Sequence, residues 1–288
     1  MTSNTGKMPM AQAAPIGIFD SGIGGLSVLR HIHQNLSHEN LLYFADSAYA
    51  PYGDRSEPEI SARSLAVTQF LLQRGIKALV VACNTATAAA IQAIREAYPN
   101  LPVIGIEPGL KPAAAQSHSK IVGVLATKAT LLSARLLTLE QQISAASGVR
   151  FALQACVGLV DQIEKGELRS AQTAQLLRRH IAPLMGQGAD TLVLGCTHYP
   201  FVRPLIEDIA SSLSTNPIAI IDTGDAASRQ LTRVLRDNAL LQSPQQQGNV
   251  TAFTTGSQTA LKTAFNSLLQ LQPAIQQVAS MAHTTAIS

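Results

Sequence analysis

The chain has 288 residues and a formal net charge of +3, and 46% of its residues are hydrophobic, 14% charged and 4% aromatic. This apolar content excludes a disordered or fibrous protein, and the length favours two domains over one. The small net charge, the absence of tryptophan and the lack of a lysine- or arginine-rich stripe argue against a nucleic acid partner. No apolar run reaches the roughly 18 residues that a membrane-spanning helix needs, so no membrane partner is expected.

The cysteines and the N-terminal segment bear on the cellular compartment. Cys83, Cys156 and Cys196 are an odd number of cysteines in a long chain. That number does not suit a disulfide framework and fits a reducing environment. Residues 1–14 are small and polar without the apolar stretch of a signal peptide, and we expect them to form a disordered tail. The sequence therefore predicts a cytoplasmic protein.

Short apolar strands alternate with helices along the chain. In chain order, strands are expected at residues 16–19, 41–44, 78–82, 103–106, 121–125, 191–194 and 250–254. Helices are expected from Leu26 onward, over residues 56–73, 86–97 and 129–142, and after Pro204. The helix over 56–73 begins with a capping box, Ser56 with Glu59, and is closed by Gly75. Alternation of this kind predicts an α/β fold with parallel sheets.

A weak internal repeat divides the chain into two similar halves. The segment from Gly75 to Cys83 reads GIKALVVAC, and the segment from Gly188 to Cys196 reads GADTLVLGC, with each cysteine at the same distance from its glycine. We therefore expect two pseudo-symmetric, doubly wound α/β domains with parallel-rich sheets. Open α/β sheets bind ligands at the carboxyl ends of their strands. The active site is accordingly expected in the cleft between the domains, with one thiol on each wall.

The domain boundaries follow from the same pattern. A first, discontinuous α/β domain is expected to comprise residues 15–107 plus 222–270, and a second α/β domain residues 108–221. A frayed C-terminal tail is expected over residues 271–288.

Both repeat cysteines lie between a strand and a helix, in Cys83-Asn84-Thr85 and Cys196-Thr197-His198. The N-terminus of a helix favours the thiolate, which is the reactive form of cysteine. A single cysteine of this kind is usually a small buried apolar residue, but the matched pair favours a functional role. His198 suits an acid, a base or a partner of a thiolate, with a turn histidine as the plain alternative. A zinc site is not expected, because close ligand pairs are missing from both halves.

The segment Asp20-Ser21-Gly22-Ile23-Gly24-Gly25 follows the first strand and resembles a phosphate loop only superficially. It lacks the Gly-Lys-Ser/Thr ending, and its acid would repel phosphate. The backbone amides and the Ser21 hydroxyl suit a carboxylate. Asp20 suits an ammonium group or a general base, with a helix N-cap as the alternative. These groups describe a small zwitterionic ligand held between two thiols, where acid–base groups on opposite faces of a carbon could invert its configuration. No lysine lies in a context that suggests a pyridoxal Schiff base, and no cofactor is expected.

With these motifs, the sequence resembles bacterial members of the cofactor-independent aspartate/glutamate racemase superfamily, from about Ile16 to Gly256. The resemblance rests on four segments: Ile18 to Gly25, Pro51-Tyr52-Gly53, Ala82 to Ala86 and Gly195 to Pro200. It implies a glutamate racemase that supplies D-glutamate for peptidoglycan. It implies that Cys83 and Cys196 are the two bases and that Asp20 and His198 tune them. The substrate-binding residues implied by it are Asp20, Ser21, Tyr52, Gly53, Asn84, Thr85, Thr197 and His198.

One segment departs from the family pattern. Family members often carry a glutamate near the cleft, in a segment similar to Val160 to Glu164. The matching position here is Asp161, a shorter acid that we name as the accessory acid, with Glu164 as the alternative and Cys156 as a core residue. The resemblance also suggests that the protein could form a homodimer and that a peptidoglycan precursor could activate it. Two other functions stay open, namely racemisation of aspartate or another acidic amino acid, and non-catalytic binding of an acidic metabolite.

Overall fold

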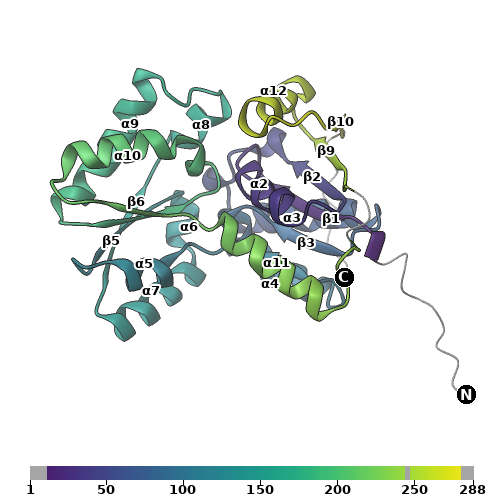
Figure 1. Cartoon of the computed structure of the whole chain (residues 1–288), viewed down its shortest axis with the longest axis horizontal. Helices are drawn as coiled ribbons and strands as arrows, with labels where there is room; N and C mark the ends of the chain where they lie inside the picture. The colour runs from purple at the N-terminus through teal and green to yellow at the C-terminus, as the bar shows by residue number, and fades with distance from the viewer. Residues whose placement is uncertain (1–11, 244–246, 280–288) are drawn as a thin grey trace, which may run out of the picture.

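A computed structural model describes residues 12–243 and 247–279 of the chain. In this part of the chain two lobes are each built around one parallel sheet, with helices packed on the sheets (Figure 1). The larger sheet has the strand order β10-β9-β2-β1-β3-β4, and the smaller one has the order β6-β5-β7-β8. All the strand pairings described are parallel.

The bounds of the elements follow the lobes. The larger lobe contains β1 (Ile16–Asp20), α2 (Leu26–Asn35), β2 (Leu41–Ala45), the 3₁₀ turns η1 (Ser47–Tyr49) and η2 (Tyr52–Asp54), α3 (Glu57–Leu72), β3 (Ala78–Val81), α4 (Asn84–Ala97), β4 (Val103–Gly105), α11 (Gly224–Asp237), β9 (Val250–Thr254), α12 (Gln258–Leu269) and β10 (Ala274–Gln277). The smaller lobe contains α5 (Leu110–Gln116), β5 (Ile121–Ala126), α6 (Lys128–Leu132), α7 (Ala134–Ser147), β6 (Arg150–Ala155), α8 (Leu159–Glu164), α9 (Ala171–Gly186), β7 (Thr191–Gly195), η3 (Tyr199–Val202), α10 (Arg203–Leu213) and β8 (Ala219–Ile221).

The two sheets share one strand order. Within the larger sheet the strands β2-β1-β3-β4 run in the order second, first, third, fourth, and β6-β5-β7-β8 repeat this order in the smaller sheet. The chain therefore winds outward in both directions from β1 and from β5, which confirms the expected pair of pseudo-symmetric, doubly wound sheets. In such sheets the place where the winding direction changes is where ligands bind.

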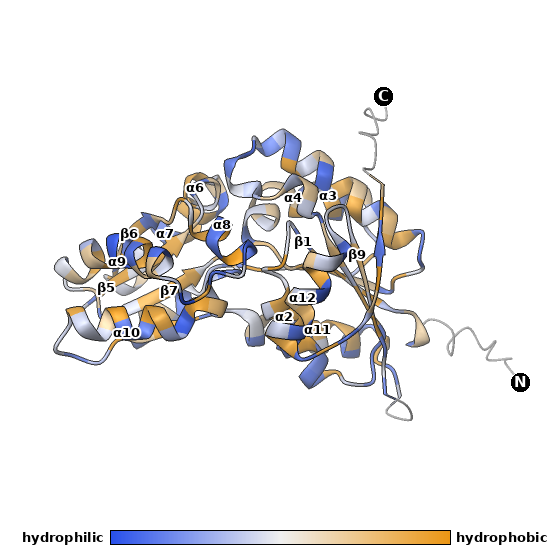
Figure 2. Ribbon diagram, turned by 90° about the horizontal axis from the view of Figure 1, so that it is seen from above, coloured by the Kyte–Doolittle hydropathy of each residue, from blue (hydrophilic) through white to orange (hydrophobic). Residues whose placement is uncertain are grey.

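Burial explains why these segments form strands. Every residue of β1, β3 and β7 is buried, as expected for parallel strands that are covered by helices on both faces. In Figure 2 the hydrophobic colour runs along the sheets, while the helices carry both colours. The capping box of Ser56 and Glu59 starts α3, and Gly75, at a φ of +74°, closes the turn after it, both as the sequence predicts.

Several elements differ from the sequence prediction. The helix expected over 129–142 is divided into α6 and α7, because Ser133 adopts an extended conformation and its hydroxyl caps the amide of Leu136. The strands β6 and β8 and the helices α5, α8, α9, α11 and α12 were not predicted. The expected frayed tail from residue 271 is wrong for Ala274–Gln277, which form β10 and pair with β9. The tail expected over 1–14 lies mostly outside the described residues.

The last expected strand is in place. Val250–Thr254 forms β9 and pairs with β2, so the chain returns to the larger sheet after the smaller lobe. No helix in residues 12–243 and 247–279 is long and apolar enough to cross a membrane.

Candidate active site

The site lies where the switch points of the two sheets face each other. Asp20 ends β1 and Cys83 follows the neighbouring β3. In the smaller sheet Thr127 follows β5 and Cys196 follows the neighbouring β7. Both thiols are free and buried, with 5% of Cys83 and 6% of Cys196 exposed. The structure thus brings together the two cysteines that the internal repeat singled out.

Asp20 has one oxygen engaged and one free. Its Oδ2 accepts hydrogen bonds from the amides of Gly22, at 3.1 Å, and Gly25, at 2.9 Å. Its Oδ1 is buried without a hydrogen-bond partner. Burial raises the pKa of this carboxyl, although the charge of His198 acts in the opposite direction. Asp20 therefore orders the glycine-rich turn and still presents an unpaired acceptor, which costs free energy unless a ligand satisfies it.

Cys83 is surrounded by neutral hydrogen-bonding groups. It is the N-cap of α4, where its Sγ accepts the amide of Ala86 at 3.4 Å, and the thiol donates to Ser21 Oγ at 3.9 Å. Burial, reinforced by the charge of Asp20, raises the pKa of the Cys83 thiol. In the unliganded site this cysteine is therefore a neutral thiol.

Cys196 is instead linked to a histidine–glutamate pair. Nδ1 of His198 lies 3.7 Å from Cys196 Sγ, and Nε2 of the same ring lies 2.6 Å from Glu164 Oε1. Burial by itself lowers the pKa of His198, but the hydrogen bonds to Cys196 and Glu164 outweigh it and raise this pKa well above its usual value. The pKa of Glu164 is lowered, because the contact with His198 overcomes the opposing effect of burial. The pair is therefore an imidazolium held by a carboxylate.

The glycines of the turn after β1 allow His198 and Glu164 to lie directly against the backbone of that turn. Oε1 of Glu164 also accepts the amide of Ile23 at 2.9 Å. A Cβ atom at Gly22 would lie 2.0 Å from that oxygen, and one at Gly24 would lie 2.2 Å from Nδ1 of His198. A side chain at either position would displace Glu164 or His198, so the two glycines let this pair lie where the lobes meet.

Three hydroxyls converge on the other side of the site. Thr85 Oγ1 lies 3.0 Å from Thr127 Oγ1 and 3.2 Å from Thr130 Oγ1, and the two latter hydroxyls are 2.9 Å apart. Thr85 belongs to the larger lobe, and Thr127 and Thr130 belong to the smaller one. Sequence reasoning missed Thr127 and Thr130. The available signal was that Thr127 follows β5 just as Ser21 follows β1 in the repeat.

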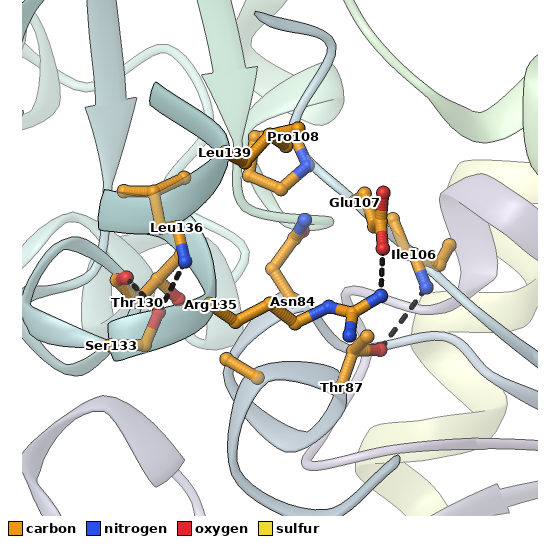
Figure 3. Close-up of a pocket in the computed structure, with 11 residues that line it drawn as sticks. Asn84, Thr87, Ile106, Glu107, Pro108, Thr130, Ser133, Arg135, Leu136 and Leu139 are labelled. Carbon is orange, nitrogen blue, oxygen red and sulfur yellow. Dashed lines mark hydrogen bonds and ion pairs between the residues drawn. The ribbon is translucent and has the colours of Figure 1, made fainter. Parts of the chain in front are cut away.

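The remaining predicted residues occupy different places. Asn84 is buried and its Nδ2 has no hydrogen-bond partner. It lines a cavity with Thr130, and the ion pair of Arg135 with Glu107 lies beside that cavity (Figure 3). The carbonyl of Thr197 accepts the hydroxyl of Ser27 at 2.7 Å.

Two of the predictions concerned residues near the turn η2. The hydroxyl of Tyr52 donates to Asp46 Oδ2 at 2.6 Å and is therefore already engaged within the protein. Gly53 lies against Thr127, because a Cβ there would be 3.0 Å from Thr127 Cβ. Tyr52 is buried in the apolar cluster that also contains Cys83.

The structure brings Glu164, and not Asp161, to His198. Asp161 lies one turn earlier on α8 and is exposed to solvent. The sequence ranking therefore failed for a geometric reason, since Glu164, the last residue of α8, is the acid that contacts Ile23 in the glycine-rich turn. Cys156 is buried and lies near Cys196, but its thiol donates to the carbonyl of Gln154 at 3.7 Å and not to a residue of this set.

The chain can now be compared with known proteins. A family model described as Asp/Glu/hydantoin racemase matches residues 16–231. A glutamate racemase of Stutzerimonas stutzeri is 52% identical over 231 residues, which make up 80% of this chain and 85% of that protein.

Solved structures agree with the sequence relatives. A glutamate racemase isoform from Bacillus anthracis matches with a TM-score of 0.83 and 31% identity, over 93% of this chain and 98% of that one. Glutamate racemase from Escherichia coli, in complex with L-glutamate and the activator UDP-MurNAc-Ala, matches with a TM-score of 0.77 and 27% identity, over 93% of this chain and 100% of that one. With a family model over most of its length and a relative at about half identity, the chain belongs to the Asp/Glu/hydantoin racemase family.

Proposed function

We propose that the protein interconverts L-glutamate and D-glutamate by moving a proton between Cα and two thiols, Cys83 and Cys196, without a cofactor. The observation that carries the proposal is the pair of buried free cysteines at equivalent strand ends of two like sheets, each beside an ionisable partner. Inversion at a carbon needs one group to remove the proton from one face and another to supply a proton to the opposite face. Two facing thiols meet that need.

Cys196 is the thiol prepared to accept the first proton. The imidazolium of His198, held at its far nitrogen by Glu164, places a positive charge 3.7 Å from Cys196 Sγ. In the proposed reaction Cys196 acts as a thiolate, and this cation balances the charge of the sulfur. When the thiolate takes the proton of Cα, the electron pair of the C–H bond stays on the substrate as a carbanion conjugated with its carboxylate.

Cys83 is the thiol prepared to donate the second proton. Burial and the charge of Asp20 keep it neutral, so it carries a proton that it can give to the opposite face of Cα. The negative charge that then remains on Cys83 Sγ is stabilised by the amide of Ala86 and the hydroxyl of Ser21. One proton leaves Cα and one arrives, and in the opposite direction the thiols exchange roles.

The unsatisfied polar groups of the site match a zwitterionic amino acid. Asp20 Oδ1, a buried acceptor without a partner, suits the α-ammonium group. Asn84 Nδ2, a buried donor without a partner, suits a carboxylate, and so do the converging hydroxyls of Thr85, Thr127 and Thr130. Charged groups held in a dry site act more strongly than in water, which helps to stabilise the carbanion.

The experiment that tests the proposal is exchange at Cα in deuterated water. The protein should incorporate deuterium at Cα of L-glutamate and of D-glutamate and should produce the opposite enantiomer from each. Cys83→Ala and Cys196→Ala should each lower racemisation by at least about 10³-fold, because either loss leaves one face of Cα without a base. Cys156→Ala, a matched loss of a buried thiol, should keep full activity. Full racemisation by either of the first two variants would reject the two-thiol proposal.

The same assay decides the substrate. L-aspartate presents the same α-carbon groups on a shorter side chain, so it should turn over far more slowly than L-glutamate if the threonine hydroxyls recognise the distal carboxylate. The product, D-glutamate, would be supplied to peptidoglycan synthesis, the role that the family resemblance implies.

Two further proposals concern the surroundings of the enzyme. The three free and buried thiols support a reducing cytoplasm as its location. The Escherichia coli glutamate racemase binds UDP-MurNAc-Ala as an activator, and we propose the same class of peptidoglycan precursor as a regulator here, to be tested by adding it to the assay. A homodimer is likewise proposed and is checked by sedimentation.

A further inference from the structure

A buried ion pair lies behind the Cys83 side of the site. Arg63, on α3, is 1% exposed, and it is the largest fully buried side chain in the described part of the chain. Its Nε donates to Asp46 Oδ2 at 3.0 Å and one terminal nitrogen donates to Asp46 Oδ1 at 2.8 Å, so the contact is bidentate. Asp46 directly follows β2 and is fully buried. Because a buried charge is costly unless its hydrogen bonds are complete, such a pair fixes one geometry for whatever is attached to it.

The Asp46 carboxylate joins three parts of the larger lobe. Besides Arg63, it accepts the hydroxyl of Tyr52 at 2.6 Å and the hydroxyl of Thr255 at 2.9 Å. The guanidinium carbon of Arg63 also lies 3.7 Å from the centre of the Tyr49 ring. Helix α3, the segment with η1 and η2, and the end of β9 are therefore tied to one carboxylate.

The segment with η1 and η2, which is bound to the Asp46 carboxylate, reaches the site at two points. The ring of Tyr52 packs in the apolar cluster of Cys83, close enough that a negative charge on this sulfur would raise the pKa of the Tyr52 phenol. The next residue, Gly53, places its backbone against Thr127 of the hydroxyl cluster. A shift of the Asp46 carboxylate would thus move both the packing beside Cys83 and the wall against Thr127.

We propose that Arg63 is a positioning residue for racemisation, which through Asp46 holds Tyr52 beside Cys83 and Gly53 against Thr127. This inference rests on the proposed function, because it concerns the half-reaction in which Cys83 exchanges the proton. Arg63 touches no reacting atom. Its effect on proton transfer should fall on Cys83, since the ring beside Cys196 is held separately by Glu164.

The test compares Arg63→Met with a matched control, Lys77→Met. Lys77 forms the other buried ion pair in the described part of the larger lobe, with Glu39, and it precedes β3 while Cys83 follows that strand. Both substitutions leave a buried carboxylate without its cation and should lower the melting temperature. Arg63→Met should lower kcat/KM by about 10²-fold, the size expected for a misplaced reacting group. Lys77→Met should keep the wild-type kcat/KM.

The readout that separates positioning from stability is the primary deuterium isotope effect at Cα, measured in each direction on folded protein. Arg63→Met should raise it in the direction in which Cys83 removes the proton. It should lower the isotope effect in the other direction, because the Cys83 step then limits the rate after the labelled proton has already left Cα. Arg63→Lys, which keeps the charge without the bidentate geometry, should recover part of the loss. Tyr52→Phe, which keeps the ring and removes only the hydrogen bond to Asp46, should show the same opposed changes and replaces Arg63→Met if that variant does not fold.

Two outcomes would overturn the inference. One is an equal change of the isotope effect in both directions in Arg63→Met or Tyr52→Phe, and the other is an effect on kcat/KM no larger than that of Lys77→Met. Failure of the proposed function looks different, because the wild-type protein would then exchange no deuterium at Cα.

Discussion

Cys83 and Cys196 occupy equivalent places in two like sheets, but their surroundings differ. Cys83 contacts a backbone amide and a hydroxyl and has the Asp20 carboxylate near it. Cys196 contacts the ring of His198, whose other nitrogen is bound by a carboxylate. The first environment favours a neutral thiol, whereas the second places a cationic ring in contact with the sulfur.

This difference shows how a nearly symmetric fold can give two equivalent cysteines unlike surroundings. The repeated strand order places both sulfurs, because it repeats the backbone positions at which they lie. The surroundings of the two sulfurs depend on side chains that the repeat does not duplicate, since no histidine–glutamate pair accompanies Cys83 in the described part of the chain. The proposed reaction, in which the two cysteines take opposite roles, needs such unlike surroundings.

Apart from loss of a thiol itself, the largest effects should come from removing the partner of each thiol. His198→Asn removes the cation beside Cys196, and Asp20→Asn removes the carboxylate near Cys83. Each should lower kcat/KM by about 10²- to 10³-fold, within the range of general acid–base groups. The fall must be equal in the two directions, because free enantiomers have the same energy and the equilibrium constant stays at one. The primary isotope effect should rise mainly in one direction for His198→Asn and mainly in the other for Asp20→Asn.

The same measurement can reject the comparison. If both variants change the two isotope effects alike, His198 and Asp20 serve as ligands of the substrate and not as partners of opposite thiols. Cys156→Ala is the control, since it removes a buried thiol outside the contacts of either partner.

A somewhat smaller effect is expected from Gly24→Ala. The added Cβ would lie 2.2 Å from Nδ1 of His198, so the ring must move away from Cys196. We expect kcat/KM to fall by up to about 10²-fold, because small displacements of reacting groups are costly. Gly186→Ala, at the end of α9 where nothing lies within 4 Å of the added Cβ, should keep full activity. Wild-type kinetics in Gly24→Ala would mean that contact between His198 and Cys196 is unnecessary.

Glu164→Gln should have a more moderate effect and a distinct pH profile. The carboxylate helps to raise the pKa of His198, so its neutral analogue should lower that pKa. The alkaline limit of kcat/KM, above which the ring loses its proton, should therefore move to lower pH, with a loss of about 10-fold at neutral pH. Asp161→Asn, on the exposed turn before it, should leave the profile unchanged. An unshifted alkaline limit would show that Glu164 does not control the charge of His198.

The same raised pKa fixes the sign of a stability effect. Folding favours the protonated ring of His198, so this contribution is complete below the ordinary histidine pKa of about 6.5 and is lost as pH rises through the folded value. The difference in unfolding free energy between wild type and Glu164→Gln should shrink over that alkaline window.

The sequence predicted the parts of the site that depend on strand ends. Buried apolar runs followed by Asp20, Cys83 and Cys196 mark carboxyl ends of parallel strands, and their meeting follows from the fold class. The capping box of α3 and the return of β9 to the larger sheet also follow from local patterns.

Other parts depend on contacts between segments far apart in the chain. Asp161 and Glu164 are both acids of one short helix, and only the packing of α8 against the glycine-rich turn decides which one meets His198. The strands β6 and β8 are less completely buried than the predicted ones, so their apolar signal is weak. Arg63 looks like an ordinary charge on a helix until its burial beside Asp46 is known.

The smallest effect is expected from Arg135→Gln, which tests whether every contact between the lobes matters for the two thiols. Arg135 on α7 pairs with Glu107, in the segment between β4 and α5, and both side chains are more than two-fifths exposed. Water and salt screen such a pair, so its loss should change the unfolding free energy by less than about 1 kcal/mol and by still less at high salt. Both isotope effects should stay at their wild-type values, because the pair adjoins the cavity beside Asn84 and contacts neither thiol (Figure 3). A raised KM for glutamate in this variant would contradict that expectation, since it would mean that an exposed ion pair and not only the buried threonine hydroxyls holds the lobes together around the substrate.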